Sequence, residues 1–204
     1  MKTRILTIVA IAALTLGLSS ATYAATTNGF AKNEEVSTVL TDVTNISKIE
    51  VHGNVELYVS DGADDQVKVY NRYYAESALV QNHNGVLRIS SYSDQKLVVW
   101  ITASDLHSIT AYDNAEVKSF GKLSAIELNV NLHNNASAQL DLDAFSANIT
   151  MADHSKADLS GTAQELNLNK AISTSVNRYN LEAANYTENK NIPAGARDMD
   201  LVIL

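Results

Sequence analysis

Three aspartates in the middle of the chain have side chains that could act as acid and base on a glycan. Asp141 and Asp143 are two positions apart, so they share one face of an extended strand, and Asp158 follows them. Catalysis on an acidic sugar also needs Arg or Lys to hold the substrate. The segment from Ser124 to Gly161 contains one basic residue, Lys156. The sequence therefore favours solvated surface acids, with a polysaccharide-acting enzyme as the alternative.

A second group of side chains could ligate a cation. Its members fall near neighbouring corners of the chain: Asp113, His133, Asn134, Asn135, Asp153 and His154. Imidazole nitrogens with carboxylate oxygens suit a divalent cation. An alignment of the chain with itself that brings Asn129 onto Asn148, however, places His133 opposite Ala152 rather than His154, which offsets the two imidazoles. We therefore interpret these residues as solvated corners, where Asp and Asn satisfy turn geometry, and predict no metal site.

A third group could bind a ligand without changing it. The densest aromatic and cationic cluster consists of Tyr70, Arg72, Tyr73 and Tyr74, with Tyr92 and Trp100 further along. Aromatic faces beside a guanidinium suit the binding of a sugar or a peptide. The alternative is that Tyr73 or Tyr74 fills the core beneath a hairpin. We take the four clustered residues as the candidate ligand-binding site.

The motifs of several other chemistries are missing from the sequence. Without cysteine there are no disulfides, thiolate zinc sites, iron–sulfur clusters or cysteine nucleophiles. The chain contains no G-x-S-x-G motif and no Gly-rich loop of the phosphate- or dinucleotide-binding types. We therefore predict that no cofactor is bound and that the protein is not an enzyme.

The segment from Met1 to Ala24 has the pattern of a secretory signal peptide. Lys2 and Arg4 precede an apolar run from Ile5 to Leu18, which is too short to span a membrane. Small residues then predict cleavage between Ala24 and Ala25. The alternative is a buried N-terminal helix. We expect an exported protein in the periplasm or at the cell surface of a Gram-negative bacterium, with no membrane span after cleavage.

The charge of the mature chain limits its partners. The full sequence has 15 basic and 23 acidic residues, and removal of Lys2 and Arg4 leaves a net charge of −10. Such a surface repels phosphate backbones and anionic lipids. Nucleic acid is therefore excluded as a partner, whereas a glycan or an envelope protein remains possible.

The sequence pattern predicts that the elements positioning these side chains are short strands. Residues 25–45 are polar and without a period, which predicts a flexible linker. From Ile46 onward apolar and polar residues alternate, as in strands with one buried face. Asn84-Gly85 between two apolar runs predicts a tight hairpin. The continuous apolar run from Leu97 to Ile101 predicts a strand buried on both faces.

An internal repeat of about 20 residues is the most informative feature. One shift brings Asn129, Asn148 and Asn167 together and also brings together Val130, Ile149 and Leu168. The segment that begins at Asp113 aligns with the one that begins at Asn134 if a two-residue insertion is allowed. The earlier half repeats at a 60-residue shift, which we interpret as three repeats. Such a period predicts a parallel β-solenoid with rungs of about 19–21 residues, an asparagine ladder and an aliphatic interior column, against a β-sandwich as the alternative.

These motifs resemble a known family. The similarity lies in Ile49-Glu50-Val51-His52-Gly53, the run from Val55 to Val59, Val67-Lys68-Val69, Asn84 to Ile89, Val98 to Ile101, Leu106 to Ile109, and the repeats from Asp113. The chain is similar to the "putative autotransporter adhesin, head GIN" domain family of exported, mainly Bacteroidetes proteins. The resemblance implies one domain over residues 46–204 with a right-handed β-helix-like fold, and it brings no catalytic residues.

These observations together predict a non-catalytic envelope protein that is structural or adhesin-like. We expect it to bind a glycan or protein partner through a side face of the solenoid. The alternatives are a β-helix enzyme that acts on polysaccharide and a self-assembling structural protein. The apolar segment from Met199 to Leu204 would be an aggregation hazard if it were free, so we expect it to dock as a last strand. The alternative is a mobile recognition peptide.

Overall fold

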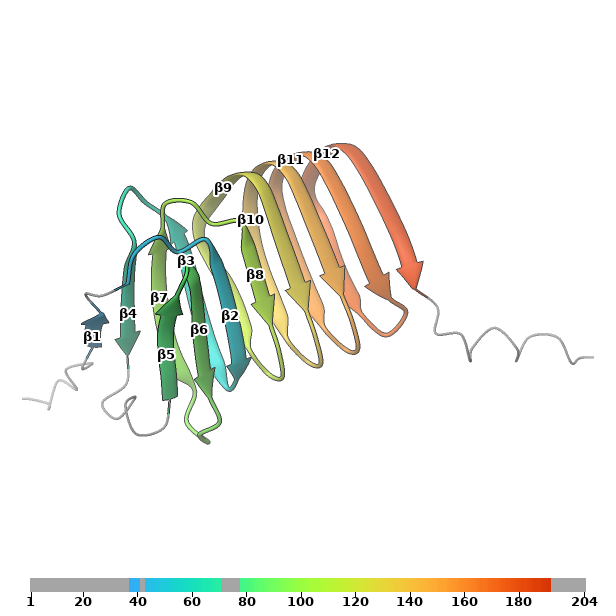
Figure 1. Ribbon diagram of the computed structural model, residues 1–204. Coiled ribbons are helices and arrows are strands. Elements are labelled where there is room, and N and C mark those ends of the chain that lie inside the picture. Colours follow the sequence, from blue (N-terminus) through green and yellow to red (C-terminus); the bar gives the residue numbers. More distant parts are fainter. Residues whose placement is uncertain (1–36, 41–42, 71–77, 192–204) are drawn as a thin grey trace, which may run out of the picture. The chain divides into compact units, whose positions relative to one another are not determined.

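The computed structural model describes residues 37–40, 43–70 and 78–191, and this part of the chain folds as strands without helices. The all-β prediction is confirmed. Twelve strands form one curled sheet (Figure 1). They are β1 (Ser37–Leu40), β2 (Lys48–Gly53), β3 (Val55–Asp61), β4 (Gln66–Tyr70), β5 (Ala78–His83), β6 (Val86–Ser91), β7 (Leu97–Ala103), β8 (Ser108–Ala111), β9 (Glu116–Leu132), β10 (Ser137–Met151), β11 (Lys156–Ala171) and β12 (Ser175–Asn191). Among the described residues, no helix is long and apolar enough to cross a membrane.

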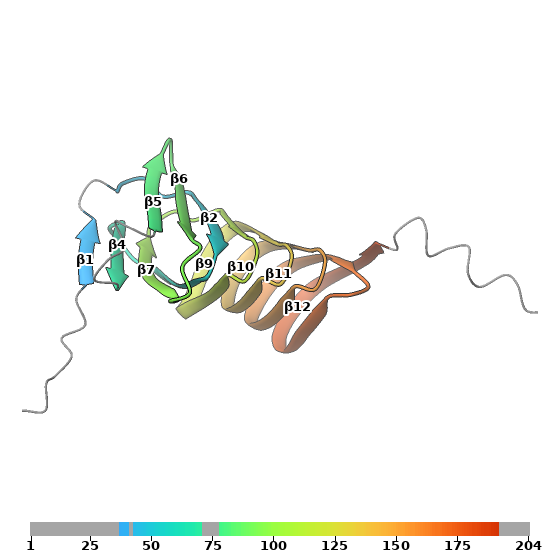
Figure 2. The same cartoon turned by 90° about the horizontal axis from the view of Figure 1, so that it is seen from below.

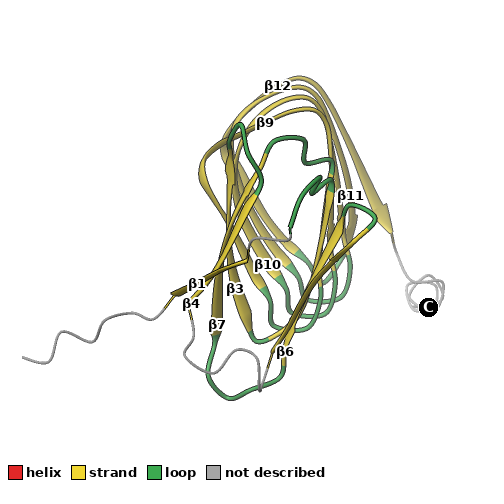
Figure 3. Cartoon of the chain, turned by 60° about the vertical axis from the view of Figure 1, so that its left-hand side comes forward, coloured by secondary structure: helices red, strands yellow, loops and turns green. Residues whose placement is uncertain are grey.

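The C-terminal half of the described chain is a parallel ladder. Strands β9, β10, β11 and β12 follow one another in chain order, and each pairs with the next over almost its whole length. Each of these strands bends midway, as Figures 1 and 3 show. Ile149 pairs with Val130 on one side and with Leu168 on the other. The shift at which the sequence repeats is therefore the register of neighbouring strands.

Two side-chain columns predicted from the repeat are confirmed. Val130, Ile149 and Leu168 are buried and lie side by side in the core. The asparagine ladder is also present. Asn148 Nδ2 donates to Asn129 Oδ1 at 3.1 Å, and Asn167 Nδ2 donates to Asn148 Oδ1 at 3.0 Å. The amides thus bond from strand to strand along the ladder.

The predicted two-residue insertion lies in β9. Lys118 pairs with Gln139 of β10, and the next pair joins Lys122 to Asp141, so β9 uses a longer stretch of chain than β10 between these two pairs. The extra residues fall within Ser119–Gly121, where the chain bulges outward. Phe120 is exposed in this bulge, and Gly121 has a φ of 82°.

The N-terminal half does not continue the same winding, which corrects our interpretation of the 60-residue shift. Ile49 and Ile109 are not three repeats apart, because β2 and β8 are direct neighbours with these two residues opposite each other. Strand β6 pairs with the other edge of β2, and β3 lies between β7 and β9 in the same way. The chain forms β2 and β3 first and later adds strands on both sides of them. The residues in between form β4 to β7 instead of two further rungs.

Antiparallel pairs end the sheet on the N-terminal side. Strand β4 pairs with β7 and β1, and β5 pairs with β6 (Figure 2). The predicted hairpin is confirmed at β5 and β6. Its turn residues Asn84 and Gly85 have φ values of 51° and 78°, which a tight hairpin requires. Strand β1 belongs to the segment for which the sequence predicts a linker.

The prediction for the run from Leu97 to Ile101 was wrong in one respect. In β7, Leu97, Val99 and Ile101 are fully buried, but Val98 and Trp100 on the other face are half-buried. Trp100 belongs to a cluster of aromatic rings on this outer face, with Tyr58, Tyr70 and Phe120. A continuous apolar run therefore did not mean burial on both faces.

Strand β12 forms one edge of the described sheet, where it pairs with β11. At the position that Leu168 occupies in β11, β12 carries Glu188. This carboxylate lies 3.4 Å from Lys170 Nζ and 3.7 Å from Lys190 Nζ. Charged side chains on an edge strand discourage pairing with other chains. The segment from Met199 to Leu204, for which docking is predicted, lies outside the described residues, as do Ala24 and Ala25.

Candidate functional site

Three tripeptides with a common pattern lie side by side on β9, β10 and β11. They are Ser124-Ala125-Ile126, Asp143-Ala144-Phe145 and Thr162-Ala163-Gln164. Asp143 pairs with Ser124 and Thr162, and Ala144 pairs with Ala125 and Ala163. Each strand therefore contributes a polar residue, an alanine and a larger side chain at the same three positions.

These tripeptides line a groove that runs across the strands. The loop Ser104–His107 lines it as well, and the volume is about 700 Å³. Ala144 and Ala163 expose only 7% and 5% of their surface, whereas Ile126 and Phe145 expose 83% and 58%. The alanine side chains pack against the core, so the low floor between a row of exposed polar side chains and a row of larger ones is strand backbone. We call this hollow the cross-strand groove.

Two aspartates outside the groove bind residues at its β9 end. Asp65 Oδ1 accepts hydrogen bonds from the backbone N–H and the hydroxyl of Ser104, at 2.9 and 3.1 Å, and Asp65 Oδ2 accepts one from Ile46 N–H at 2.7 Å. Burial opposes ionisation, but these donors hold the pKa of Asp65 below its usual value. Asp61 Oδ2 accepts a bond from Ser124 N–H at 2.6 Å. Neither aspartate was among the candidate site residues predicted from the sequence.

The polar groups of the groove are acids, hydroxyls, an imidazole and an amide. Asp143 Oδ1 accepts a hydrogen bond from Thr162 Oγ1 at 3.1 Å. Asp105 lies 3.4 Å from His107 Nε2 in the loop. None of the described residues that line the groove is Lys or Arg. The groove can therefore donate to and accept from hydroxyl groups, but it offers no cation to an anionic ligand.

The three candidate acids do not converge on one point. Asp141 and Asp143 do share the outward face of β10, as their spacing predicts. Asp143 lines the cross-strand groove, whereas Asp141 lines a separate hollow of about 320 Å³ beside Tyr58 and Phe120. Asp158 lines a third hollow, where its Oδ1 accepts a bond from Asn177 Nδ2 at 3.0 Å. The structure therefore assembles no pair of these carboxyl groups around a common substrate position.

The corner residues are linked from strand to strand by hydrogen bonds between backbone N–H groups and side-chain oxygens. Asp113, Asn134 and Asp153 have φ values of 60°, 58° and 57°. Asn134 N–H donates to Asp153 Oδ2 at 2.9 Å, and Asp113 N–H donates to Asn134 Oδ1 at 3.2 Å. The His133 ring stacks on Tyr112, with centroids 4.7 Å apart. Within the described ranges, no group of three or more His, Cys, Asp or Glu side chains could hold a metal ion.

The structure brings Tyr70, from the predicted ligand cluster, to an aromatic surface on β3, β4, β7 and β9. Its ring lies 6.4 Å from Trp100, which stacks on Tyr58 at 4.6 Å and contacts Phe120 at 5.1 Å. Tyr92 lies elsewhere, with its hydroxyl 3.4 Å from Asp113 Oδ2. The other three cluster members, Arg72, Tyr73 and Tyr74, lie outside the described residues.

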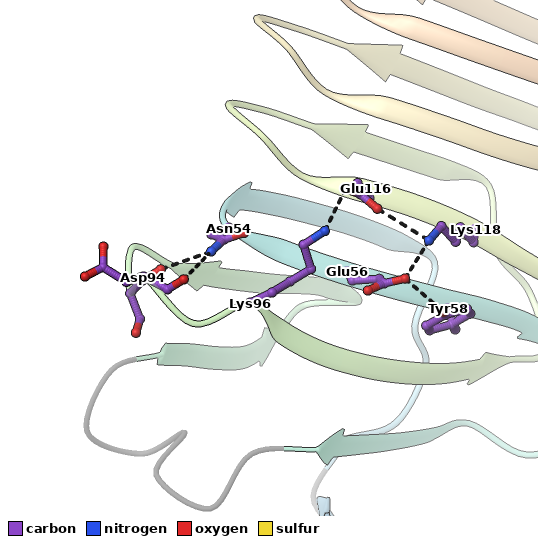
Figure 4. Close-up of polar contacts among 8 residues, drawn as sticks. Asn54, Glu56, Tyr58, Asp94, Lys96, Glu116 and Lys118 are labelled. Atoms are coloured by element: carbon purple, nitrogen blue, oxygen red, sulfur yellow. Dashed lines mark hydrogen bonds and ion pairs between the residues drawn. The ribbon is translucent and has the colours of Figure 1, made fainter.

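Polar groups next to these rings already have partners (Figure 4). Lys118 Nζ donates to Glu56 Oε1 at 2.5 Å, and Tyr58 donates to the same oxygen at 2.7 Å. Both bonds lower the pKa of Glu56, against the effect of partial burial, and the bond with Glu56 raises the pKa of Lys118. Lys96 Nζ donates to Glu116 Oε1 at 2.7 Å. Since the rings stack on each other and the charges are paired, the cross-strand groove is the better candidate site.

Comparison with known families places this fold. Residues 45–192 match the family described as "Putative auto-transporter adhesin, head GIN domain". The chain belongs to this family. The resemblance seen in the sequence motifs is thereby confirmed over most of the chain. A search of curated proteins gave no match.

Solved structures share the fold of this family member. A "putative adhesin" from Bacteroides fragilis NCTC 9343 is 17% identical, with a TM-score of 0.66 over 77% of this chain and 76% of that one. A "putative lipid binding protein" from Parabacteroides distasonis ATCC 8503 is 9% identical, with a TM-score of 0.59 over 76% and 78%. A "putative adhesin" from the same strain is 16% identical, with a TM-score of 0.56 over 77% and 78%. At these identities the similarity establishes a common fold.

Proposed function

We propose that the protein is an exported, non-catalytic, adhesin-like protein of the Gram-negative cell envelope that binds a glycan through the cross-strand groove. The observation that carries this proposal is the groove itself. Its volume of about 700 Å³ lies within the range of ligand sites, roughly 300–1,000 Å³. The family description as an adhesin supports a binding role at the cell surface or in the periplasm.

The side chains of the groove favour a glycan over a protein partner. A sugar ring has apolar C–H faces and a rim of hydroxyl groups. Ile126 and Phe145 offer exposed apolar surface to such faces. Ser124, Asp143 and Thr162 follow the opposite side of the floor and can exchange hydrogen bonds with hydroxyls.

The separation of Asp141, Asp143 and Asp158 supports a binding role over catalysis. Hydrolysis of a glycosidic bond uses two carboxyl groups on either side of that bond. Only one of these three aspartates lines the groove. The second carboxylate of the groove, Asp105, is next to His107 in the end loop.

A lipid is the second candidate ligand. One protein with this fold is described as a lipid binding protein. The exposed apolar side chains of Ile126 and Phe145 are the feature of this chain that favours such a ligand. An acyl chain would contact only the row of larger side chains, whereas a glycan would contact both this row and the polar row.

A glycan array probed with the mature protein tests the proposed function. We expect binding to at least one glycan, and loss of that binding in Phe145→Ala and Asp143→Ala. Tyr179→Ala is the matched control, because this aromatic side chain is 93% exposed on β12, outside the groove. Binding to phospholipid vesicles that depends on Phe145 but not on Asp143 would favour the lipid. Intact glycan binding in both groove variants would contradict the proposed site.

Export and fold remain part of the proposal. N-terminal sequencing of protein from the periplasm or the medium should begin at Ala25, and a product that retains Met1 would contradict export. We also propose that the parallel ladder is a right-handed β-helix-like solenoid in its C-terminal half. The pairing of β9, β10 and β11 one sequence repeat apart supports this winding. An experimental structure would test its handedness.

A further inference from the structure

The cross-strand groove repeats its chemistry at the spacing of the strands. Neighbouring strands of a sheet lie about 4.7–4.9 Å apart. At each step from β9 to β11, the groove presents one polar residue, one alanine and one larger side chain. A ligand made of similar units with the same spacing would find equivalent contacts on each strand.

A linear polysaccharide has a repeat of this size. Successive pyranose rings in an extended chain advance by a distance close to the separation of neighbouring strands. An extended peptide advances by about 3.3 Å per residue, so its side chains do not match the strand spacing. A lipid acyl chain contains no repeating polar group. The periodicity of the groove therefore fits a polysaccharide better than these other ligands.

The charge of the groove limits the kind of sugar. Asp105 and Asp143 are acidic, and the described lining contains no Lys or Arg. The whole chain has a net charge of −8. A uronic acid would bring a further negative charge to this surface without a cationic partner, whereas a neutral sugar would not.

The ends of the groove suggest its length. On one side the loop Ser104–His107 lies against β9, where Asn129 N–H donates to His107 O at 2.9 Å. On the other side only the polar and alanine positions continue onto β12, where Glu182 pairs with Thr162 and Ala183 pairs with Ala163. The residue after Ala183 is Ala184, so the row of larger side chains does not extend to β12. Contacts to both rows are thus available on three strands.

We propose that the cross-strand groove binds a linear, uncharged polysaccharide with one sugar unit on each of β9, β10 and β11. This inference rests on the proposed glycan-binding function and gives it a ligand class and a length. Ile126 on β9 and Phe145 on β10 contact sugar faces, Gln164 on β11 offers its amide to the third unit, and the polar row binds hydroxyl groups. The loop Ser104–His107 limits the chain at one end.

Titration calorimetry with oligosaccharides of one to six units tests the inference. The probes are cello-oligosaccharides, chito-oligosaccharides and oligogalacturonates, together with a length series of any backbone found on the array. We expect affinity to increase with each unit up to three or four and then to stay constant. Oligogalacturonates should bind at least about tenfold more weakly than the uncharged series.

Variants place the sugar units on individual strands. Phe145→Ala should weaken binding of the trisaccharide about tenfold, and Tyr179→Ala should leave it unchanged. Gln164→Phe, which extends the apolar row on β11, should strengthen binding of the trisaccharide but not of the monosaccharide. All of these side chains are outside the core, so circular dichroism should show unchanged folding.

The outcomes separate this inference from the proposed function. Groove-dependent binding that does not increase beyond one unit would overturn the inference and leave the function intact. A preference for oligogalacturonates would do the same. Absence of binding to every glycan would overturn both.

Discussion

The two halves of the sheet differ in how far apart their neighbouring strands lie in the sequence. In the ladder of β9 to β12, each strand pairs with the strand that directly precedes it in the chain. In the N-terminal half, β2 pairs with β6 and β8, which the chain reaches only after several other strands. Contacts between distant residues cost more chain entropy and form more slowly. We therefore expect the ladder to form first and the N-terminal half to add to it.

This difference also separates the two surfaces with exposed large side chains. The cross-strand groove lies on the repeating half, so it consists of equivalent positions on successive strands. The aromatic cluster around Trp100 lies where β4, β7, β3 and β9 meet, and its members come from strands without a common repeat. A regular ladder offers a surface for a repeating ligand, whereas the irregular half offers a single packed cluster.

The largest expected effect comes from truncating one aliphatic column in both halves. Ile49 and Ile149 belong to the same interior column and are both fully buried. Ile149→Ala and Ile49→Ala should each lower the free energy of unfolding by about 2–5 kcal/mol, because each leaves a cavity in the core. Chemical denaturation with fluorescence and circular dichroism measures both values.

The comparison of the two variants tests whether the halves unfold together. One transition in both variants would mean a single cooperative unit. If Ile49→Ala produced a separate early transition, the N-terminal half would be an independent unit. Ile172→Ala is the control, since this isoleucine is 61% exposed and should lose less than about 0.5 kcal/mol. A similarly small loss for Ile149→Ala would contradict the interior column.

Sequence reasoning succeeded in the ladder because the repeat there is local. Asn129, Asn148 and Asn167 could be aligned at one shift, and that shift is the register of the strands. It failed for Ile49 and Ile109, since a shift between such distant positions does not reveal how the intervening chain runs. Direct pairing and two intermediate rungs give the same sequence pattern.

The second prediction compares two glycines with different surroundings in the ladder. Gly161 has a φ of 95°, and a Cβ added there would lie 2.0 Å from Leu142 O. Gly121 has a φ of 82° in the β9 bulge, with nothing within 4 Å of an added Cβ. Gly161→Ala should therefore lower stability by about 3 kcal/mol or more, and Gly121→Ala by about 1 kcal/mol.

The difference in stability loss between these two glycine variants measures the steric cost of the close contact between Gly161 on β11 and Leu142 on β10. Both replacements force alanine into a backbone conformation that it rarely adopts, so this contribution largely cancels. Equal losses of stability would mean that the close approach of Gly161 to β10 relaxes at little cost. Thermal denaturation of both variants distinguishes the two results.

The third prediction concerns the asparagine ladder. Asn148 bonds to both Asn129 and Asn167, so Asn148→Ala removes two side-chain hydrogen bonds. Each contributes about 0.5–1.5 kcal/mol, and we expect a loss of about 1–2 kcal/mol. Asn177→Ala, which removes two exposed bonds, one to Asp158 and one from Tyr179 N–H, should lose less than about 0.5 kcal/mol. If Asn148→Ala and Asn177→Ala lowered the free energy of unfolding equally in urea denaturation, the asparagine ladder would add no stability of its own.

The candidate site was less predictable than the fold. The shift that aligns the asparagines also aligns Ser124, Asp143 and Thr162, so their common row could have been found from the repeat. The anchoring of the groove could not, because Asp65 reaches Ser104 from a distant part of the chain in the irregular half. The exposure of Phe145 could also have been predicted, because it lies two positions after Asp143 on the same face of β10.

The smallest expected effect is electrostatic and lies where the two halves join. Glu56 on β3 accepts hydrogen bonds from Lys118 on β9 and from Tyr58, which lower its pKa in the folded protein. A carboxyl group with a lowered pKa stabilises the fold above its unfolded pKa of about 4.3, and this contribution is lost as the pH falls through the folded pKa. Since the pKa of Lys118 is raised, its own contribution persists at neutral pH.

Glu56→Gln should therefore destabilise the protein by about 0.5–1 kcal/mol at pH 7, and by less as the pH falls through the folded pKa of Glu56 and the wild-type carboxyl group takes up a proton. Glu182→Gln at an exposed position of β12 is the control and should show no such pH dependence. Glu116 also bonds to Lys118 and Lys96, so both proteins must be compared at each pH to cancel its titration. A destabilisation that stays constant from pH 7 to pH 3 would mean that Glu56 acts through its shape and not through its charge. The junction would then depend on packing, as the ladder does.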